Sequence, residues 1–239
     1  TKEQLDEMYS HTNLSLYRLP EFDNGIWGTD YEVEEKDDNI KITFTYHLPV
    51  IPATDTYLSY TVHSDGTVDV NLKLSGADKI GQLPEFGVIF TMDADFKNLT
   101  WCGLGPEETY KDRNHAKLGL YKNQVKDNMA KYLRPQECGN KEGVRFAELT
   151  DDNGYGIRFS CMDSENPISF SALPYTPHEI DNANHPNELP PILNTYVRVA
   201  KEQMGVGGDD TWGAPVHPEF LIDNTKDMDF TFSFKGIVK

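Results

Sequence analysis

The residues best suited to chemistry lie in the segment 204–213, which reads MGVGGDDTWG. Adjacent glycines adopt backbone conformations that residues with a Cβ avoid, and we predict a positive φ at Gly207, at Gly208 or at both. Trp212 on such a loop is either presented to a ligand or packed beside a tight turn, and the sequence leaves both interpretations open. Because an indole ring stacks on the apolar face of a pyranose, the first interpretation predicts a sugar contact.

A second cluster of polar side chains lies in the segment 101–113, which reads WCGLGPEETYKDR. Its two glycines predict a bend and its proline predicts the end of a strand. Asp112 and Arg113 are expected to form a charged pair that holds this loop, with Glu108 as a further partner. Clustered loop charges more often brace a loop than react, so we favour a structural role for them.

The remaining motifs assign no catalytic residue and no metal ligand to this chain. The loop 132–140 (YLRPQECGN) suits either sugar hydroxyls or the bracing of a neighbouring loop. His178 precedes Asn182 at the position where a zinc-protease helix requires a second histidine. The sequence contains neither a phosphate-binding loop nor a serine elbow, and no two carboxylates are marked as the pair that glycoside hydrolysis requires.

The composition indicates a globular protein and excludes some partners. The chain has 239 residues, of which 38% are hydrophobic and 11% aromatic, and this fits one large all-β domain or two small ones. Its 39 acidic and 22 basic residues give a net charge of −17, which argues against binding to nucleic acid or to an anionic membrane.

Cysteine usage and the chain ends bear on where the protein is found. Cys102, Cys138 and Cys161 are too scattered for a disulfide framework and indicate reduced thiols in a cytoplasmic protein. No apolar run is long enough to span a membrane, and no signal-peptide pattern is present. The first residue is not methionine, which indicates a fragment or a processed chain.

Alternating and apolar runs between turn residues predict a fold made almost entirely of strands. The expected strands are 41–48, 58–63, 67–74, 86–92, 144–149, 155–162, 168–175, 196–200 and 229–238. Hairpin turns are predicted at 64–66 and 150–154, and one short helix at 176–184, with a threonine cap and a proline at its first position. Residues 1–39 are predicted to be partly irregular, and the whole chain, 1–239, to form a single β-sandwich domain.

Four ordered motifs resemble the C-terminal β domain of the family 2 β-galactosidases, which is a separate small subunit in some bacteria. They are GLGPEETYKDR (103–113), YLRPQECGN (132–140), SFSALPYT with HPNEL (169–176 and 185–189) and MGVGGDDTWG (204–213). Because that domain is similar in fold to galactose mutarotases, the resemblance implies a large antiparallel supersandwich. The chain departs from the family at Cys138, where asparagine is usual, and at 17–24, which only loosely echoes the opening RAPTDND.

The resemblance implies a non-catalytic domain or small subunit of a β-galactosidase that hydrolyses terminal β-D-galactosides, such as lactose, with retention. The catalytic glutamates, and a divalent cation or sodium, belong to the family's TIM barrel, which this chain lacks; no cofactor is implied on the chain itself. The expected partners are that barrel, on the same chain or as a large subunit, and a galactoside, in an oligomeric assembly.

The same resemblance assigns roles to single residues. Trp212 would reach into the active site as a stacking platform for the sugar, with its ring at least partly exposed in the isolated chain. The residues expected to shape the surrounding loops are Gly207, Gly208, Asp209, Asp210, Glu108, Asp112 and Arg113.

The alternative function is a free-standing mutarotase-like enzyme or a carbohydrate-binding module. A mutarotase needs a histidine and a glutamate placed as acid and base around a bound hexose. His115, His178 and Glu137 are candidates by residue type alone.

Overall fold

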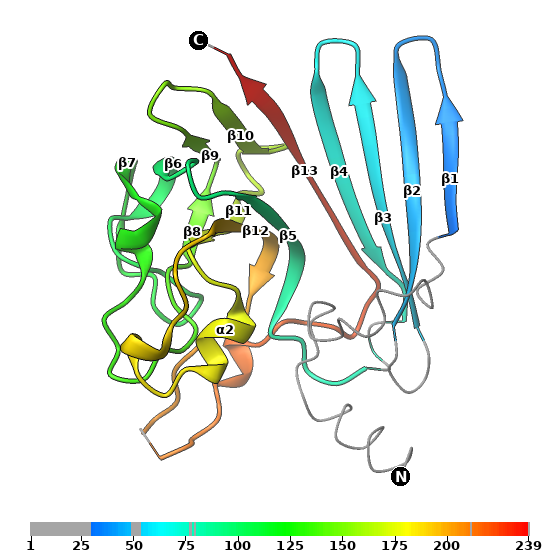
Figure 1. Cartoon of the computed structure of the whole chain (residues 1–239). Helices are drawn as coiled ribbons and strands as arrows, with labels where there is room; N and C mark the ends of the chain where they lie inside the picture. The colour runs from blue at the N-terminus through cyan, green and yellow to red at the C-terminus, as the bar shows by residue number, and fades with distance from the viewer. Residues whose placement is uncertain (1–29, 49–53, 77, 79, 211, 239) are drawn as a thin grey trace. The chain divides into compact units, whose positions relative to one another are not determined.

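The computed structural model describes residues 30–48, 54–76, 78, 80–210 and 212–238 (Figure 1). By contact density the chain divides into two compact units, which we call unit 1 (Thr1–Pro84 and Leu221–Thr231) and unit 2 (Glu85–Phe220 and Phe232–Lys239). The single domain over 1–239 stays a prediction. No helix within the described ranges has the length and apolar character needed to cross a membrane.

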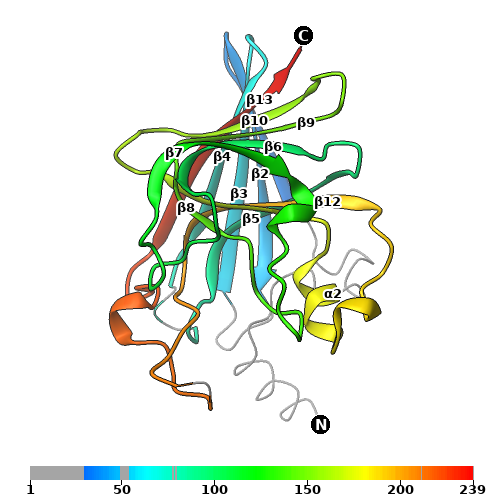
Figure 2. The same ribbon diagram turned by 90° about the vertical axis from the view of Figure 1, so that its left-hand side faces the viewer.

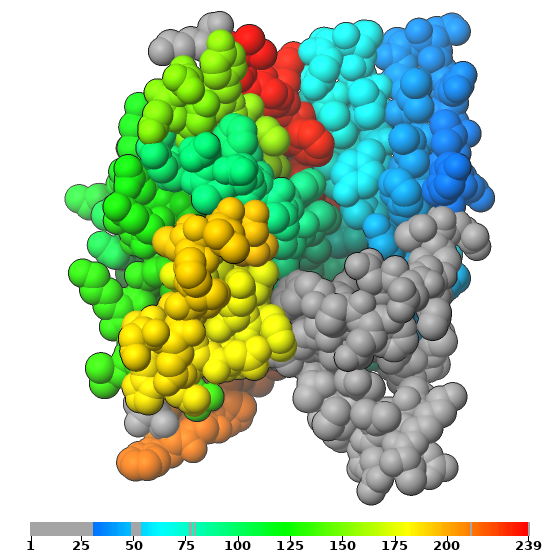
Figure 3. All heavy atoms as spheres, in the orientation of Figure 1, coloured from blue at the N-terminus to red at the C-terminus, as the bar shows by residue number. Residues whose placement is uncertain are grey.

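Unit 1 is built on one antiparallel sheet with the strand order β1-β2-β3-β4-β13. The strands are β1 (Asp30–Glu35), β2 (Asn39–Leu48), β3 (Thr54–His63), β4 (Thr67–Leu74) and the first residues of β13 (Met228–Ile237), and Figure 3 draws β1 to β4 in blue to cyan. Gly66, with φ +80°, makes the predicted turn between β3 and β4. Asn71 ties β4 to β13, since its side chain donates to Asp229 Oδ1 at 2.6 Å and to Thr231 Oγ1 at 2.8 Å.

Unit 2 is a sandwich of two antiparallel sheets, ordered β13-β10-β9-β6-β7 and β5-β12-β11-β8 (Figure 2). Its strands are β5 (Glu85–Asp93), β6 (Asn98–Gly105), β7 (Lys117–Gln124), β8 (Lys141–Val144), β9 (Phe146–Thr150), β10 (Gly156–Cys161), β11 (Ile168–Leu173) and β12 (Asn194–Gln203). The sheets meet through aromatic rings: Phe159 of β10 lies 5.5 Å from Phe90 of β5 and 5.9 Å from Phe170 of β11. The predicted all-β antiparallel fold is therefore confirmed.

The predicted helix is α2 (Pro177–Asn182), and its cap is the one that the sequence indicated. Thr176 Oγ1 accepts from the Glu179 backbone N at 3.1 Å, and Glu179 Oε2 accepts from the Thr176 backbone N at 2.7 Å. The helix turns Ile180 into a small cluster with Cys138 and Leu173. Three 3₁₀ turns complete the described elements: η4 (Val125–Asn128), η5 (Pro186–Glu188) and η6 (Pro218–Phe220).

The structure adds four strands that the sequence did not predict: β1, β6, β7 and β8. In β6 the bend predicted at Gly103 and Gly105 is wrong, because both lie within the strand. A Cβ would come within 2.8 Å of Val144 Cγ2 at Gly103 and within 2.9 Å of Tyr121 Cδ2 at Gly105, so close packing explains both glycines. The strand does end before Pro106, as predicted, whereas the segment 17–24 lies outside the described residues.

Candidate functional site

The loops 101–113 and 132–140 meet at one buried carboxylate, Glu108. Its side chain is 8% exposed, and its Oε1 accepts from Arg113 Nη1 at 2.6 Å and from the Tyr132 hydroxyl at 2.5 Å. Its Oε2 accepts from the Gly139 backbone N at 2.8 Å. Donors from three points of the chain therefore satisfy this anion, which braces both loops.

Asp112 does not pair with Arg113, so that part of the prediction is wrong. Instead its Oδ2 accepts from the backbone N of Gly207 at 2.7 Å, which joins the loop 101–113 to the glycine-rich segment. Gly205 lets this carboxylate approach, because a Cβ there would come within 2.7 Å of Asp112 Oδ2. The other oxygen, Oδ1, is buried and has no hydrogen-bond partner among the described residues.

The prediction of a positive φ at Gly207 or Gly208 is also wrong, since neither glycine adopts one. Gly208 is required for another reason: a Cβ there would lie 2.1 Å from the carbonyl oxygen of Ala214. Among the described residues of the segment, the one in the left-handed region is Gly213, with φ +108°, directly after Trp212. The segment turns after the tryptophan rather than before it.

Trp212 is 92% exposed, which confirms the expectation that its ring is open to solvent in this chain. The backbone around it is nevertheless held, because Asp210 Oδ1 accepts from the backbone N of Trp212 at 2.8 Å and of Ala214 at 3.2 Å. Asp209 pairs with His217 Nε2 at 2.8 Å, and this hydrogen bond raises the pKa of His217. The loop is thus braced by both predicted acids while the indole ring points into solvent.

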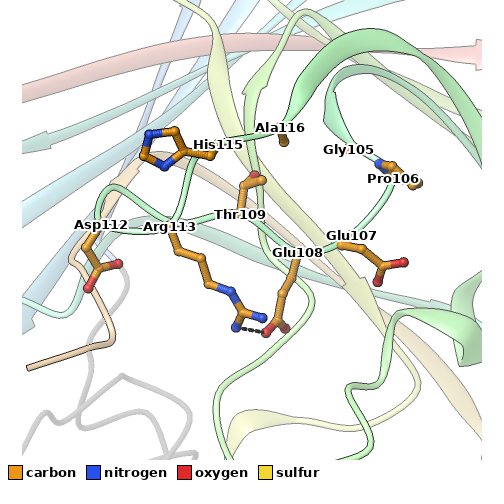
Figure 4. Close-up of a pocket in the computed structure, with 9 residues that line it drawn as sticks. All are labelled: Gly105, Pro106, Glu107, Glu108, Thr109, Asp112, Arg113, His115 and Ala116. Carbon is orange, nitrogen blue, oxygen red and sulfur yellow. Dashed lines mark hydrogen bonds and ion pairs between the residues drawn. The ribbon is translucent and has the colours of Figure 1, made fainter. Parts of the chain in front are cut away.

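A hollow of about 380 Å³ lies over the loop that carries Glu108 (Figure 4). It is lined by Gly105, Pro106, Glu107, Glu108, Thr109, Asp112, Arg113, His115 and Ala116. In Figure 4 the Glu108–Arg113 pair lies on one side, and the Asp112 carboxylate lies apart from it. No three His, Cys, Asp or Glu side chains in the described part of the chain are grouped to hold a metal ion.

A buried ion cluster around Arg198 of β12 was not predicted. The guanidinium is 7% exposed and donates to Glu137 Oε2 at 2.9 Å, Glu137 Oε1 at 2.5 Å and Glu85 Oε2 at 3.2 Å. Burial favours the neutral forms, but Arg198 outweighs it at Glu137 and keeps the pKa of that carboxyl below its usual value, whereas the pKa of Glu85 is raised by burial. A single arginine within the apolar run VRVA is the sequence signal that could have indicated this cluster.

This cluster bears on the mutarotase candidates. The hydrogen-bond partners of Glu137 among the described residues are Arg198, Tyr110 and Gln203, and none is a histidine. His178 instead contacts Asn182 on α2 at 3.0 Å. Glu137 is therefore engaged as an ion-pair partner and is not grouped with a histidine acid.

The departure at Cys138 changes what supports the loop 132–140. The thiol is 1% exposed, lies 3.9 Å from Met129 Sδ and packs with Leu173 and Ile180. Burial raises the pKa of Cys138 to about 11, so the thiol is neutral at pH 7. Apolar packing supports this position in the present chain.

Comparison with known proteins assigns the family. The sequence model of the family described as β-galactosidase small chain matches residues 4–234. The chain therefore belongs to this family. The β-galactosidase of Halalkalibacterium halodurans is 40% identical over 228 residues, which are 90% of this chain and 22% of the relative. The β-galactosidase small subunit of Latilactobacillus sakei is 31% identical over 212 residues, which are 84% of this chain and 66% of that subunit.

The long relatives extend well beyond the matched residues. The chain spans about a fifth of the length of the long curated relatives, with 22% of the H. halodurans enzyme and 20% of the β-galactosidase of Streptococcus thermophilus. Among solved structures, a galactose mutarotase related enzyme from Lactobacillus acidophilus aligns with 87% of this chain and 71% of its own, at 14% identity and a TM-score of 0.42.

Proposed function

We propose that this chain is a non-catalytic part of a β-galactosidase and that Trp212 supplies a stacking platform for the sugar in an active site completed by a TIM barrel outside the chain. The observation that carries the proposal is the 92% exposure of this indole ring on a loop whose backbone is held in place. An aromatic ring of this size left in water forgoes a large burial energy, so a ligand or a partner is expected to cover it.

The bracing of the loop supports the same role. Asp210 fixes the backbone at Trp212, and Asp112 fixes it at Gly207, 2.7 Å from its carboxylate. A platform that is ordered before the sugar arrives loses little conformational entropy when it binds. The loop therefore combines an exposed apolar face with a restrained backbone, as a sugar-stacking residue requires.

The buried carboxylates of the chain support a non-catalytic assignment. Retaining hydrolysis needs one carboxylate as nucleophile and another as acid and base, on either side of the scissile bond. Glu137 and Glu85 both bind Arg198, and Glu108 is satisfied by three donors. The two catalytic glutamates, with a divalent cation or sodium, are accordingly assigned to the barrel, on the same polypeptide or a large subunit.

The substrate and the oligomeric assembly are proposed from the family to which the chain belongs. The assembled enzyme is proposed to be an oligomer that hydrolyses terminal β-D-galactosides, such as lactose, with retention. Its proposed location is the cytoplasm, since Cys102, Cys138 and Cys161 are all free thiols.

The test is hydrolysis of a chromogenic β-galactoside by this chain alone and by the assembled enzyme. We expect turnover only from the assembled enzyme. The Glu137→Gln variant of the isolated chain controls for contaminants, because a contaminating hydrolase is indifferent to it. Turnover by the isolated chain that Glu137→Gln abolishes without lowering the melting temperature would overturn the proposal.

A further inference from the structure

The sheet of unit 1 has one apolar face and one polar face. In the register of β1 with β2, Tyr31 lies opposite Phe44 and Val33 opposite Ile42. In the register of β2 with β3, Ile42 lies opposite Tyr60 and Ile40 opposite Val62. Because side chains alternate along a strand, these residues share one face, which we call the apolar band: Tyr31, Val33, Ile40, Ile42, Phe44, Tyr60 and Val62.

The apolar band is open where it reaches the edge of the sheet. On the same face of β4, Val70 is 0% and Leu72 8% exposed, as expected of a core. Toward β1 the exposed fraction rises to 44% at Ile40, 50% at Val33 and 65% at Tyr31. All helices and strands described in unit 1 are strands of this one sheet, so none of them covers the band. Contiguous apolar surface of this kind marks a binding face.

The aromatic rings of the band are arranged for a protein partner rather than a sugar chain. Phe44 lies 6.2 Å from Tyr31 with the two rings tilted by 43°, and 6.1 Å from Tyr60 with the two rings at 79°. Rings at such angles interlock into a ridged surface, whereas stacking of successive sugars needs a flat row. Interlocked aromatic and aliphatic side chains are the usual core of a protein interface.

We propose that the apolar band docks onto the part of the β-galactosidase that lies outside this chain. The inference rests on the proposed function, and the length of the relatives supports it: the chain covers 22% of the H. halodurans enzyme and 20% of the S. thermophilus enzyme, which leaves most of each relative to supply a covering surface.

The charge around the apolar band favours the rest of the β-galactosidase as its partner over a second copy of the chain. Glu35 shares the face of the band at the end of β1, and the following turn carries Asp37 and Asp38. A second copy would bring the same acidic rim and a net charge of −17 against this one. Like charges facing each other across an interface are unfavourable, so the partner is expected to present apolar side chains within a neutral or basic rim.

The test compares lysine substitutions on the two faces of the same sheet in the assembled β-galactosidase. Val33→Lys and Ile40→Lys place a charge in the band, and Thr45→Lys places the same charge on the opposite face of β2. We expect the two band variants to raise the dissociation constant of the assembly at least about tenfold, and Thr45→Lys to leave it within about threefold. Val33 and Ile40 are already half exposed, so each substitution should change the melting temperature of the isolated chain little. If one variant unfolds, the other still tests the inference.

Each outcome decides the matter. Equal assembly of the band variants and the control overturns the inference and leaves the proposed function standing. Failure of the wild-type chain to enter any assembly with galactosidase activity overturns both. Analytical sedimentation of the isolated chain is the last measurement, and we expect a monomer. A dimer that Val33→Lys dissociates would show that a second copy of the chain covers the apolar band, and would overturn the inference.

Discussion

Trp101 and Trp212 are the same residue type in opposite surroundings. Trp101 in β6 is 1% exposed, donates from Nε1 to the Leu104 carbonyl at 3.1 Å, and lies 5.3 Å from the ring of Tyr121. Trp212 is 92% exposed, and its surroundings hold its backbone through Asp210 and leave its ring in solvent.

The local sequences do not explain this difference, because a glycine and then a proline follow both tryptophans within five residues. Around Trp101, however, β7 pairs with β6 and places Tyr121 against the ring, and Lys141 lies over the indole at 5.2 Å. Around Trp212 the polar contacts are made by acids of its own loop and by Asp112. Partners distant in sequence therefore decide which tryptophan belongs to the core and which is presented.

The largest expected effect separates the two tryptophans by stability. Trp101→Ala should lower the free energy of unfolding of the isolated chain by about 3–5 kcal/mol, because it empties a packed site. Trp212→Ala should change it by less than about 0.5 kcal/mol, since the ring supports little of the core. Denaturant unfolding of both variants measures these changes. Equal losses of unfolding free energy would contradict the assignment of Trp101 to the core and of Trp212 to the surface.

A smaller effect of opposite sign is expected at Lys141, next to Trp101. Lys141 is 2% exposed, and burial lowers its pKa from 10.5 to about 8, so the folded state bears the cost of a buried charge at pH 7. Lys141→Met should therefore stabilise the chain at pH 7 by about 1–3 kcal/mol.

The pH dependence at Lys141 gives the control. Between about pH 8 and 10.5 the unfolded wild type binds this proton and the folded state does not, so its stability rises with pH in this window. Lys141→Met lacks this contribution, and the gap between the two proteins should close by the top of the window. A gap that is the same at pH 7 and pH 10.5 would contradict a buried charge.

A still smaller loss is expected at Arg113, which supports the loops rather than the sugar. Its guanidinium binds Glu108 at 2.6 Å but is 56% exposed, so Arg113→Ala should cost about 1 kcal/mol of stability. Arg134→Ala, which removes an exposed arginine from the neighbouring loop, is the matched control. An unchanged melting temperature together with a strongly raised KM of the assembled enzyme would contradict this prediction. Arg113 would then take part in sugar binding, as proposed for Trp212.

The smallest effect concerns the charge that holds the Trp212 loop. The hydrogen bond to Asp209 raises the pKa of His217, so the ion pair is complete below the ordinary histidine pKa and is lost as pH rises through the raised value. In an NMR titration Asp209→Asn should lower the pKa of His217. Glu219→Gln should lower it less, because that carboxylate is 3.8 Å away. A pKa that does not respond to Asp209→Asn would remove this contact from the description of the loop.

The sequence predicted the fold better than it predicted the contacts of the site. Alternating runs and turn residues correctly predicted nine strand segments and the Thr176 cap, because these signals are local. Strand β6 was missed because its glycines resemble a turn, although the packing of Val144 and Tyr121 is what requires them. The partners of Asp112 and Glu137 could not be predicted, since Gly207 and Arg198 lie 95 and 61 residues away.

The central claim is that Trp212 is this chain's contribution to sugar binding, and the affinity of the assembled enzyme for a galactoside inhibitor tests it most directly. Trp212→Ala should weaken binding by about 1–3 kcal/mol, which is roughly ten- to a hundredfold, while the isolated variant keeps its stability. Leu133→Ala, which truncates an apolar side chain that is 93% exposed elsewhere in unit 2, should leave the affinity unchanged. An assembled Trp212→Ala enzyme that binds the inhibitor as tightly as the wild type would contradict the claim.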